Sequence, residues 1–139
     1  MKHLYFSFIF LLFFGTISLH AQQSNSEKII GCWKIKSVEI IEEMDKEEAE
    51  EIRNGALGMI ICLDGKGKFS TTMPPEKGGA VVGTGIYKLE ADGKTLTQSR
   101  DVEDEDVDLP AEIIKLTDKS LSLKIEYMII HYERVEEKK

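Results

Sequence analysis

The sequence is dominated by eight short segments typical of β-strands, each bounded by turn residues. Two of the connections contain Asp-Gly pairs, at 64–65 and 92–93, and this dipeptide is typical of tight β-hairpins. Eight is the strand count of a closed antiparallel up-and-down barrel, which is just wide enough to hold one small ligand. An all-β barrel of this type is therefore predicted. The predicted strands are 30–41, 56–63, 68–73, 80–89, 94–100, 111–117, 121–125 and 128–135.

One segment departs from this strand pattern. Residues 42–54 are highly charged and have few apolar side chains, namely Met44, Ala49 and Ile52. Gly55 is a natural helix stop. The pattern predicts a short surface helix, or lid, inserted after the first strand.

The N-terminal residues have the pattern of a signal peptide and so indicate export. A short basic start is followed by an apolar run over residues 4–14, which suits a signal peptide and is too short to span a bilayer. Cleavage after Ala21 leaves 118 of the 139 residues, enough for one small domain. We expect a signal peptide over 1–21, a flexible segment over 22–28, the barrel over 29–135 and a charged tail over 136–139. The expected location is the periplasm or the exterior of the cell.

Cys32 raises the question of a lipid anchor, because Ile-Ile-Gly-Cys resembles the end of a lipoprotein signal. Cys32, however, lies well past the apolar run, beyond the charged Glu27 and Lys28. A lipid-attachment cysteine should follow the apolar run directly. We therefore predict that the protein is not lipid-anchored and that this stretch is the first strand.

Charge and cysteine content limit the partners further. The formal charge is −7, and −8 without Lys2, with no basic stripe, so nucleic acid and anionic membranes are not expected as partners. No other apolar run approaches membrane-spanning length, so the cleaved chain is expected to be soluble. Two cysteines remain, Cys32 and Cys62. Export permits a disulfide between them, but two unpaired thiols fit the sequence as well.

The order of several short motifs over about residues 28–135 resembles the lipocalin-like domain proteins exported by Bacteroidetes-type bacteria, which have calycin barrels. The matching residues are Gly31, Trp33 and Lys34; Gly67 and Phe69; Gly85, Tyr87, Lys88 and Leu89; Ile114, Leu116, Thr117, Leu121 and Leu123; and Tyr132 and Arg134. Two features depart from the family pattern: the last hairpin lacks a Gly or Asn turn, and the first connection is unusually acidic.

The resemblance implies a structural role for Trp33 and Arg134. In lipocalins the first-strand Trp plugs the closed end of the barrel, and a basic residue of the last strand packs across it. A guanidinium can cover an aromatic face and still reach backbone carbonyls. This pair is expected to close the barrel and not to bind a ligand.

Strand alternation predicts an apolar inner face with a few hydroxyl groups, and a bend in the first strand near Val38. Such a wall either fills itself as a core or leaves a cavity for a small hydrophobic molecule. The predicted barrel-lining residues are Ile35, Met59, Ile61, Phe69, Thr71, Met73, Tyr87, Leu89, Leu96, Ile114, Leu123, Ile130 and Tyr132. Ligand binding is the leading function; the alternative is a filled barrel that contacts an unknown protein of the cell envelope through its acidic helix and loops.

Other chemistries are weakly indicated. The acidic loop 101–108 could offer oxygen ligands to calcium but lacks the spacing of an EF-hand. Cys32, Cys62 and His131 could form a nucleophile or zinc site, but they stand singly on different strands. We expect a non-enzyme with no cofactor and no metal.

Overall fold

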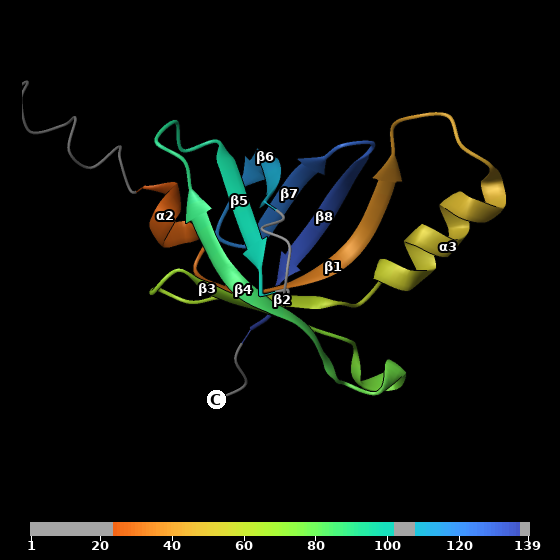
Figure 1. Ribbon diagram of the computed structural model, residues 1–139, viewed down its shortest axis with the longest axis horizontal. Helices are drawn as coiled ribbons and strands as arrows, with labels where there is room; N and C mark the ends of the chain where they lie inside the picture. Colours follow the sequence, from red (N-terminus) through yellow and green to blue (C-terminus); the bar gives the residue numbers. More distant parts are fainter. Residues whose placement is uncertain (1–23, 102–107, 137–139) are drawn as a thin grey trace, which may run out of the picture.

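The computed structural model describes residues 24–101 and 108–136 and forms a closed barrel of eight antiparallel strands in chain order (Figure 1). The predicted fold is thereby confirmed. The predicted signal peptide, most of the acidic loop and most of the charged tail lie outside the described residues. The strands are β1 (Gly31–Ile40), β2 (Ile60–Leu63), β3 (Lys68–Thr72), β4 (Val81–Leu89), β5 (Thr95–Arg100), β6 (Asp108–Leu116), β7 (Ser120–Ile125) and β8 (Met128–Arg134).

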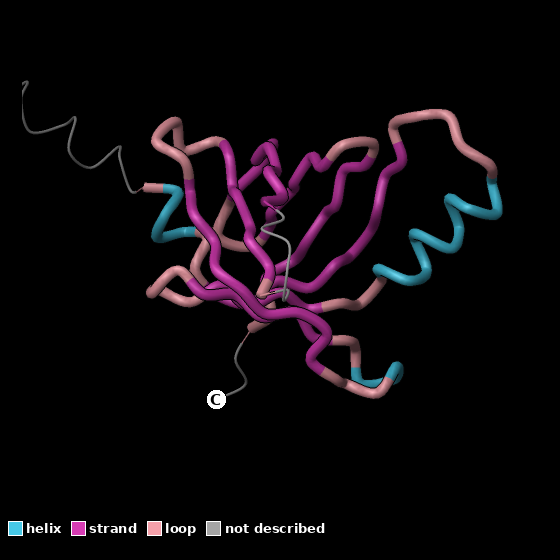
Figure 2. The backbone as a smooth tube through the Cα atoms, viewed as in Figure 1, coloured by secondary structure: helices cyan, strands magenta, loops and turns pink. Residues whose placement is uncertain are grey.

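The described part of the chain has three short helices outside the sheet: α2 (Asn25–Lys28), α3 (Lys46–Ala56) and a 3₁₀ turn, η1 (Pro75–Lys77) (Figure 2). The carboxylate of Asp45 caps α3 by accepting a hydrogen bond from the Glu47 N–H at 3.3 Å. The helix continues through Gly55, so the prediction of a strand from Ala56 is wrong. The chain instead reverses at Gly58, whose φ of 83° is in the left-handed region that favours glycine.

Register shifts in β1 and β6, two of the three in the sheet described, set which of the predicted side chains face the barrel interior. The register shift between Ile35 and Ser37 in β1 leaves Ile35 and Val38 both buried, as the predicted bend near Val38 requires. A second shift, between Ile113 and Lys115 in β6, was not predicted. It turns Ile114 outward, where the side chain is 51% exposed. The prediction that Ile114 lines the barrel is therefore wrong.

The two Asp-Gly turns are held by aspartate side chains. The Asp64 carboxylate accepts hydrogen bonds from the N–H groups of Lys66 and Lys68 at 2.9 and 2.8 Å. Asp92 does the same for Lys94 and Thr95 at 2.8 and 3.1 Å. These bonds favour the charged form of each carboxyl group. The hydrogen bond from the Lys68 N–H is the main cause of the lowered pKa of Asp64, and the bond from the Lys94 N–H is the main cause of the lowered pKa of Asp92.

These lowered pKa values predict a loss of stability in acid. A carboxyl whose folded pKa is below its unfolded value of about 3.9 stabilises the fold above that value and loses the effect as the pH falls through the folded pKa. Below about pH 4, the Asp64→Asn/Asp92→Asn variant should therefore lose stability less steeply than the unmodified protein. Urea unfolding between about pH 6 and pH 2.5 measures this. If the free energy of unfolding falls equally with pH in the variant and in the unmodified protein, the two turns contribute nothing to acid sensitivity.

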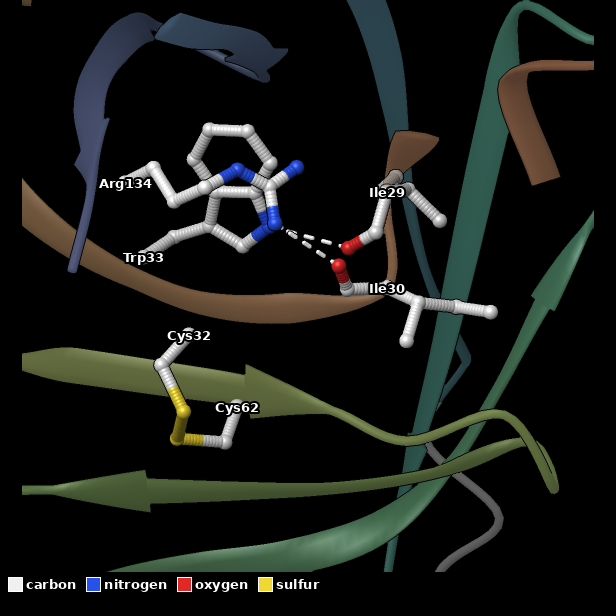
Figure 3. The surroundings of a disulfide bond; sticks show 6 residues. All are labelled: Ile29, Ile30, Cys32, Trp33, Cys62 and Arg134. Atoms are coloured by element: carbon white, nitrogen blue, oxygen red, sulfur yellow. Dashed lines mark hydrogen bonds between the residues drawn. A yellow bond between two sulfur atoms is a disulfide. The ribbon is translucent and has the colours of Figure 1, made fainter. Parts of the chain in front are cut away.

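Trp33 and Arg134 close one end of the barrel (Figure 3). Trp33 is fully buried, and its indole Nε1–H donates to the Ile29 carbonyl at 2.9 Å. Arg134 pairs with Trp33 across the neighbouring strands, with its guanidinium carbon 4.2 Å from the ring centroid. The same guanidinium donates to the carbonyls of Lys28, Ile30 and Asp118. Arg134 thus ties the start of β1 to the β6–β7 turn.

A disulfide joins the first two strands next to this closed end. Cys32 and Cys62 are directly opposite one another in the β1–β2 register, and their sulfur atoms are bonded (Figure 3). The disulfide, and not a pair of free thiols, is the arrangement in the structure.

Candidate functional site

The other half of the barrel contains a cavity of about 200 Å³. It lies where β1, β5 and β7 approach their carboxyl ends, and the last residue of α3, Ala56, contributes to its wall. Most of the lining side chains are apolar. The lining residues are Ile35, Ala56, Met59, Ile61, Thr71, Gln98, Arg100, Leu109, Ala111, Ile125, Ile130 and Tyr132.

The predicted barrel-lining residues are found in the cavity, in the packed core and, for a few, outside both. Those that line the cavity are Ile35, Met59, Ile61, Thr71, Ile130 and Tyr132. Phe69, Leu96 and Leu123 are buried in the core cluster instead. Tyr87 packs against that core, and its hydroxyl donates to the Asp64 carbonyl. Leu89 lines a separate surface hollow beside α2, and Met73 is half-buried just beyond β3.

Two glycines of β4 differ in how closely other side chains and backbone approach them. Gly83 and Gly85 are two residues apart on the same strand and so face the same side. A Cβ at Gly85 would be 2.1 Å from the Ser99 carbonyl oxygen and 2.8 Å from the Phe69 ring. A Cβ at Gly83 would meet nothing closer than the Thr71 Cβ at 4.0 Å. The barrel is thus tightly packed at Gly85, whereas at Gly83 the described residues leave room for a side chain.

The polar groups of the cavity come mainly from β5. Gln98 and Arg100 are opposite Tyr87 and Gly85 in the β4–β5 register and line the cavity together. Arg100 is the last residue of β5 and is exposed. On the far wall, Tyr132 is 7% exposed, and burial raises the pKa of its hydroxyl well above the ordinary value. Tyr132 is therefore a neutral group at physiological pH.

Several of these residues were not found by sequence reasoning. Gln98, Arg100, Leu109 and Ala111 occupy inward positions on β5 and β6, and Ala56 is contributed by the end of α3. A search for alternating large apolar residues passes over polar and small side chains, and Leu109 was missed because the predicted strand began at residue 111 whereas β6 begins at Asp108. The signal that was available is the register itself: once Leu96 is placed inside, Gln98 and Arg100 follow by alternation.

In the described residues, neither the outer face of the barrel nor the cysteine pair forms a second site as well defined as the cavity. His131 on β8 contacts Ser122 at 2.8 Å and Glu39 at 3.4 Å, but Ser122 is only 5% exposed. Cys32 and Cys62 are bonded to each other and so provide neither a nucleophile nor a metal ligand. Within residues 24–101 and 108–136, no three histidine, cysteine, aspartate or glutamate side chains are placed to hold a metal ion. No helix in these ranges is long and apolar enough to cross a membrane.

Comparison with known proteins supports the fold. No family model and no curated protein matches this sequence. An uncharacterized protein from Bacteroides eggerthii is similar in structure, with a TM-score of 0.58 and 13% identity, over 76% of this chain and 98% of the other. A lipocalin-like protein from Bacteroides uniformis has a TM-score of 0.55 and 14% identity, over 78% and 99% of the two chains. The chain thus has a lipocalin-like barrel fold.

Proposed function

We propose that this protein is an exported, non-enzymatic carrier that binds one small apolar or amphipathic molecule inside the barrel. The observation that supports it is the cavity of about 200 Å³ in the open half, lined mainly by apolar side chains. Two of the few polar groups, Gln98 and Arg100, are on the same strand, β5. This combination, an apolar wall with a small number of placed polar groups, is typical of ligand sites.

The size of the cavity limits the ligand. A cavity of about 150 Å³ holds benzene, whereas sites for drug-sized molecules measure about 300–1,000 Å³. The value here, about 200 Å³, is close to the lower figure. A single ring or a short alkyl chain fits, and a long lipid or a haem does not fit inside without rearrangement of the wall.

Export is supported by two independent features. The apolar run over residues 4–14 suits a signal peptide. The Cys32–Cys62 disulfide suits an oxidising compartment such as the periplasm or the exterior of the cell. A carrier in such a compartment would bind a molecule that enters or leaves the cell envelope.

Filling the cavity with a side chain tests the function. Gly83→Leu should abolish binding of 1-hexanol, because Gly83 is opposite the cavity-lining Thr71 in the β3–β4 register and a long side chain there would extend into the cavity. The fold should be retained, since glycine within a strand is unfavourable by about 0.5–1 kcal/mol relative to alanine. Isothermal titration calorimetry with 1-hexanol, together with urea unfolding, measures both effects.

Lys88→Leu is the matched control, since it places the same side chain on the exposed outer face of β4. This variant should bind 1-hexanol as the unmodified protein does. Equal binding by the Gly83→Leu variant, or no binding of 1-hexanol by the unmodified protein, would contradict a ligand site in the barrel.

A further inference from the structure

We propose, on the basis of the binding function above, that the ligand is a short-chain carboxylate whose head group binds Arg100 at the cavity mouth. The apolar chain would lie between the side chains of Ile35, Ile61 and Ile130, which line the interior. Three observations carry this inference: the position of Arg100, the arrangement of the carboxylates beside it, and the hydrogen-bonding groups next to it.

Among the cavity-lining residues in the described ranges 24–101 and 108–136, Arg100 is the only one with an ionised side chain. It is opposite Gly85 in the β4–β5 register, so no side chain stands beside it on that strand. Its position as the last residue of β5 keeps it exposed to water. A guanidinium placed there keeps its hydration in the absence of a ligand and can still meet a charged group at the mouth.

Two described carboxylates lie near Arg100. Asp101 follows it in the chain, and Asp108 is opposite Ser99 in the β5–β6 register, but both accept hydrogen bonds from other groups. Asp101 accepts a hydrogen bond from the Thr84 hydroxyl at 3.2 Å, and Asp108 accepts one from the Ser99 hydroxyl. Thr84 and Ser99 alternate with the inward residues Gly85 and Arg100, and so belong to the outer face. Within residues 24–101 and 108–136, no carboxylate forms a salt bridge with Arg100.

The described polar groups that line the cavity with Arg100 suit an anion better than a cation. Gln98 and Thr71 line the same cavity and can donate hydrogen bonds from an amide and a hydroxyl. Arginine presents a planar pair of N–H donors that matches the two oxygens of a carboxylate. A neutral head group would gain less from this site, and an ammonium would be repelled by the guanidinium.

Three probes with one alkyl chain test the charge preference on the cleaved, disulfide-bonded protein. These are hexanoate, 1-hexanol and hexylammonium, and hexanoate is ionised at about pH 7. Calorimetry at low ionic strength should show that hexanoate binds about five- to tenfold more tightly than 1-hexanol, as for a partly exposed charge pair. Hexylammonium should bind more weakly than either, and added salt should reduce the advantage of hexanoate.

Arg100→Met keeps most of the side-chain length and removes the charge. This variant should bind hexanoate no better than 1-hexanol, so the ratio of the two affinities should fall to about one. Lys124→Met, which removes an exposed cation on β7 outside the cavity, should have no effect on either probe.

The outcomes separate this inference from the function on which it rests. Equal affinity of the unmodified protein for hexanoate and 1-hexanol, or an undiminished preference in Arg100→Met, would overturn the role of Arg100. If either result is found but the Gly83→Leu variant no longer binds 1-hexanol, the barrel remains a ligand site for neutral molecules. If none of the three probes binds, both the carboxylate preference and the binding function are wrong.

Discussion

Replacing Trp33 by alanine should lower the free energy of unfolding by about 3–5 kcal/mol, the cost of removing a large aromatic side chain from a close-packed core. Trp33 is fully buried and donates a hydrogen bond to the Ile29 carbonyl, and its ring contacts the Arg134 guanidinium. Its loss would leave a cavity at the closed end and uncover the Ile29 carbonyl. Urea unfolding measures the change, and Ile86→Ala on the outer face of β4 is a control expected to cost no more than about 0.5 kcal/mol.

Arg134 extends this prediction to a pair. Arg134→Ala should cost about 1–2 kcal/mol through lost packing and charge-assisted hydrogen bonds. Because the guanidinium carbon is 4.2 Å from the Trp33 ring centroid, the double variant should be less destabilised than the sum of the single variants. Strict additivity would mean that the two side chains do not act together in closing the barrel.

Loss of the disulfide should have an effect of similar size. The bond joins residues separated by 30 positions, and closing a loop of this length stabilises a fold by about 3–4 kcal/mol in the chain-entropy account. Cys32→Ala/Cys62→Ala should therefore unfold at a markedly lower urea concentration than the oxidised protein. The reduced protein should resemble the double variant, because the neighbouring strand pairing does not require the bond.

Two results would contradict this expectation. If dithiothreitol leaves the stability of the unmodified protein unchanged, the thiols are not joined in solution. If the protein purified from its own host contains two free thiols by mass spectrometry, the disulfide no longer supports an oxidising compartment. The signal-like residues 4–14 would then be the sole support for export.

The architecture could be predicted because each strand carries its own pattern and each turn its own chemistry. Asp64 and Asp92 mark hairpins through side-chain hydrogen bonds that depend only on nearby residues. Features set by packing could not be predicted in this way. Gly55 seemed the natural helix end, but the chain reverses at Gly58, and the bulge that exposes Ile114 depends on the pairing of β6 with β7.

The candidate site was predictable only in part for a related reason. Alternation identifies Ile35 and Ile61 as inward residues, but it does not say whether opposite walls touch. The open space depends in part on the small side chain of Ala111, which an apolar pattern does not record. Arg100 was passed over because a charged residue at an inward position contradicts the pattern of a core.

The most direct test of ligand binding is a titration of the protein, labelled at its isoleucine methyl groups, with hexanoate and with 1-hexanol, followed by NMR. The cavity is lined by Ile35, Ile61, Ile125 and Ile130. Ile86 and Ile114 are exposed, at 58% and 51%. We predict saturable shifts at the four cavity methyl groups and none at the two exposed ones. Unchanged cavity methyl signals, or shifts confined to Ile86 and Ile114, would contradict a binding site inside the barrel.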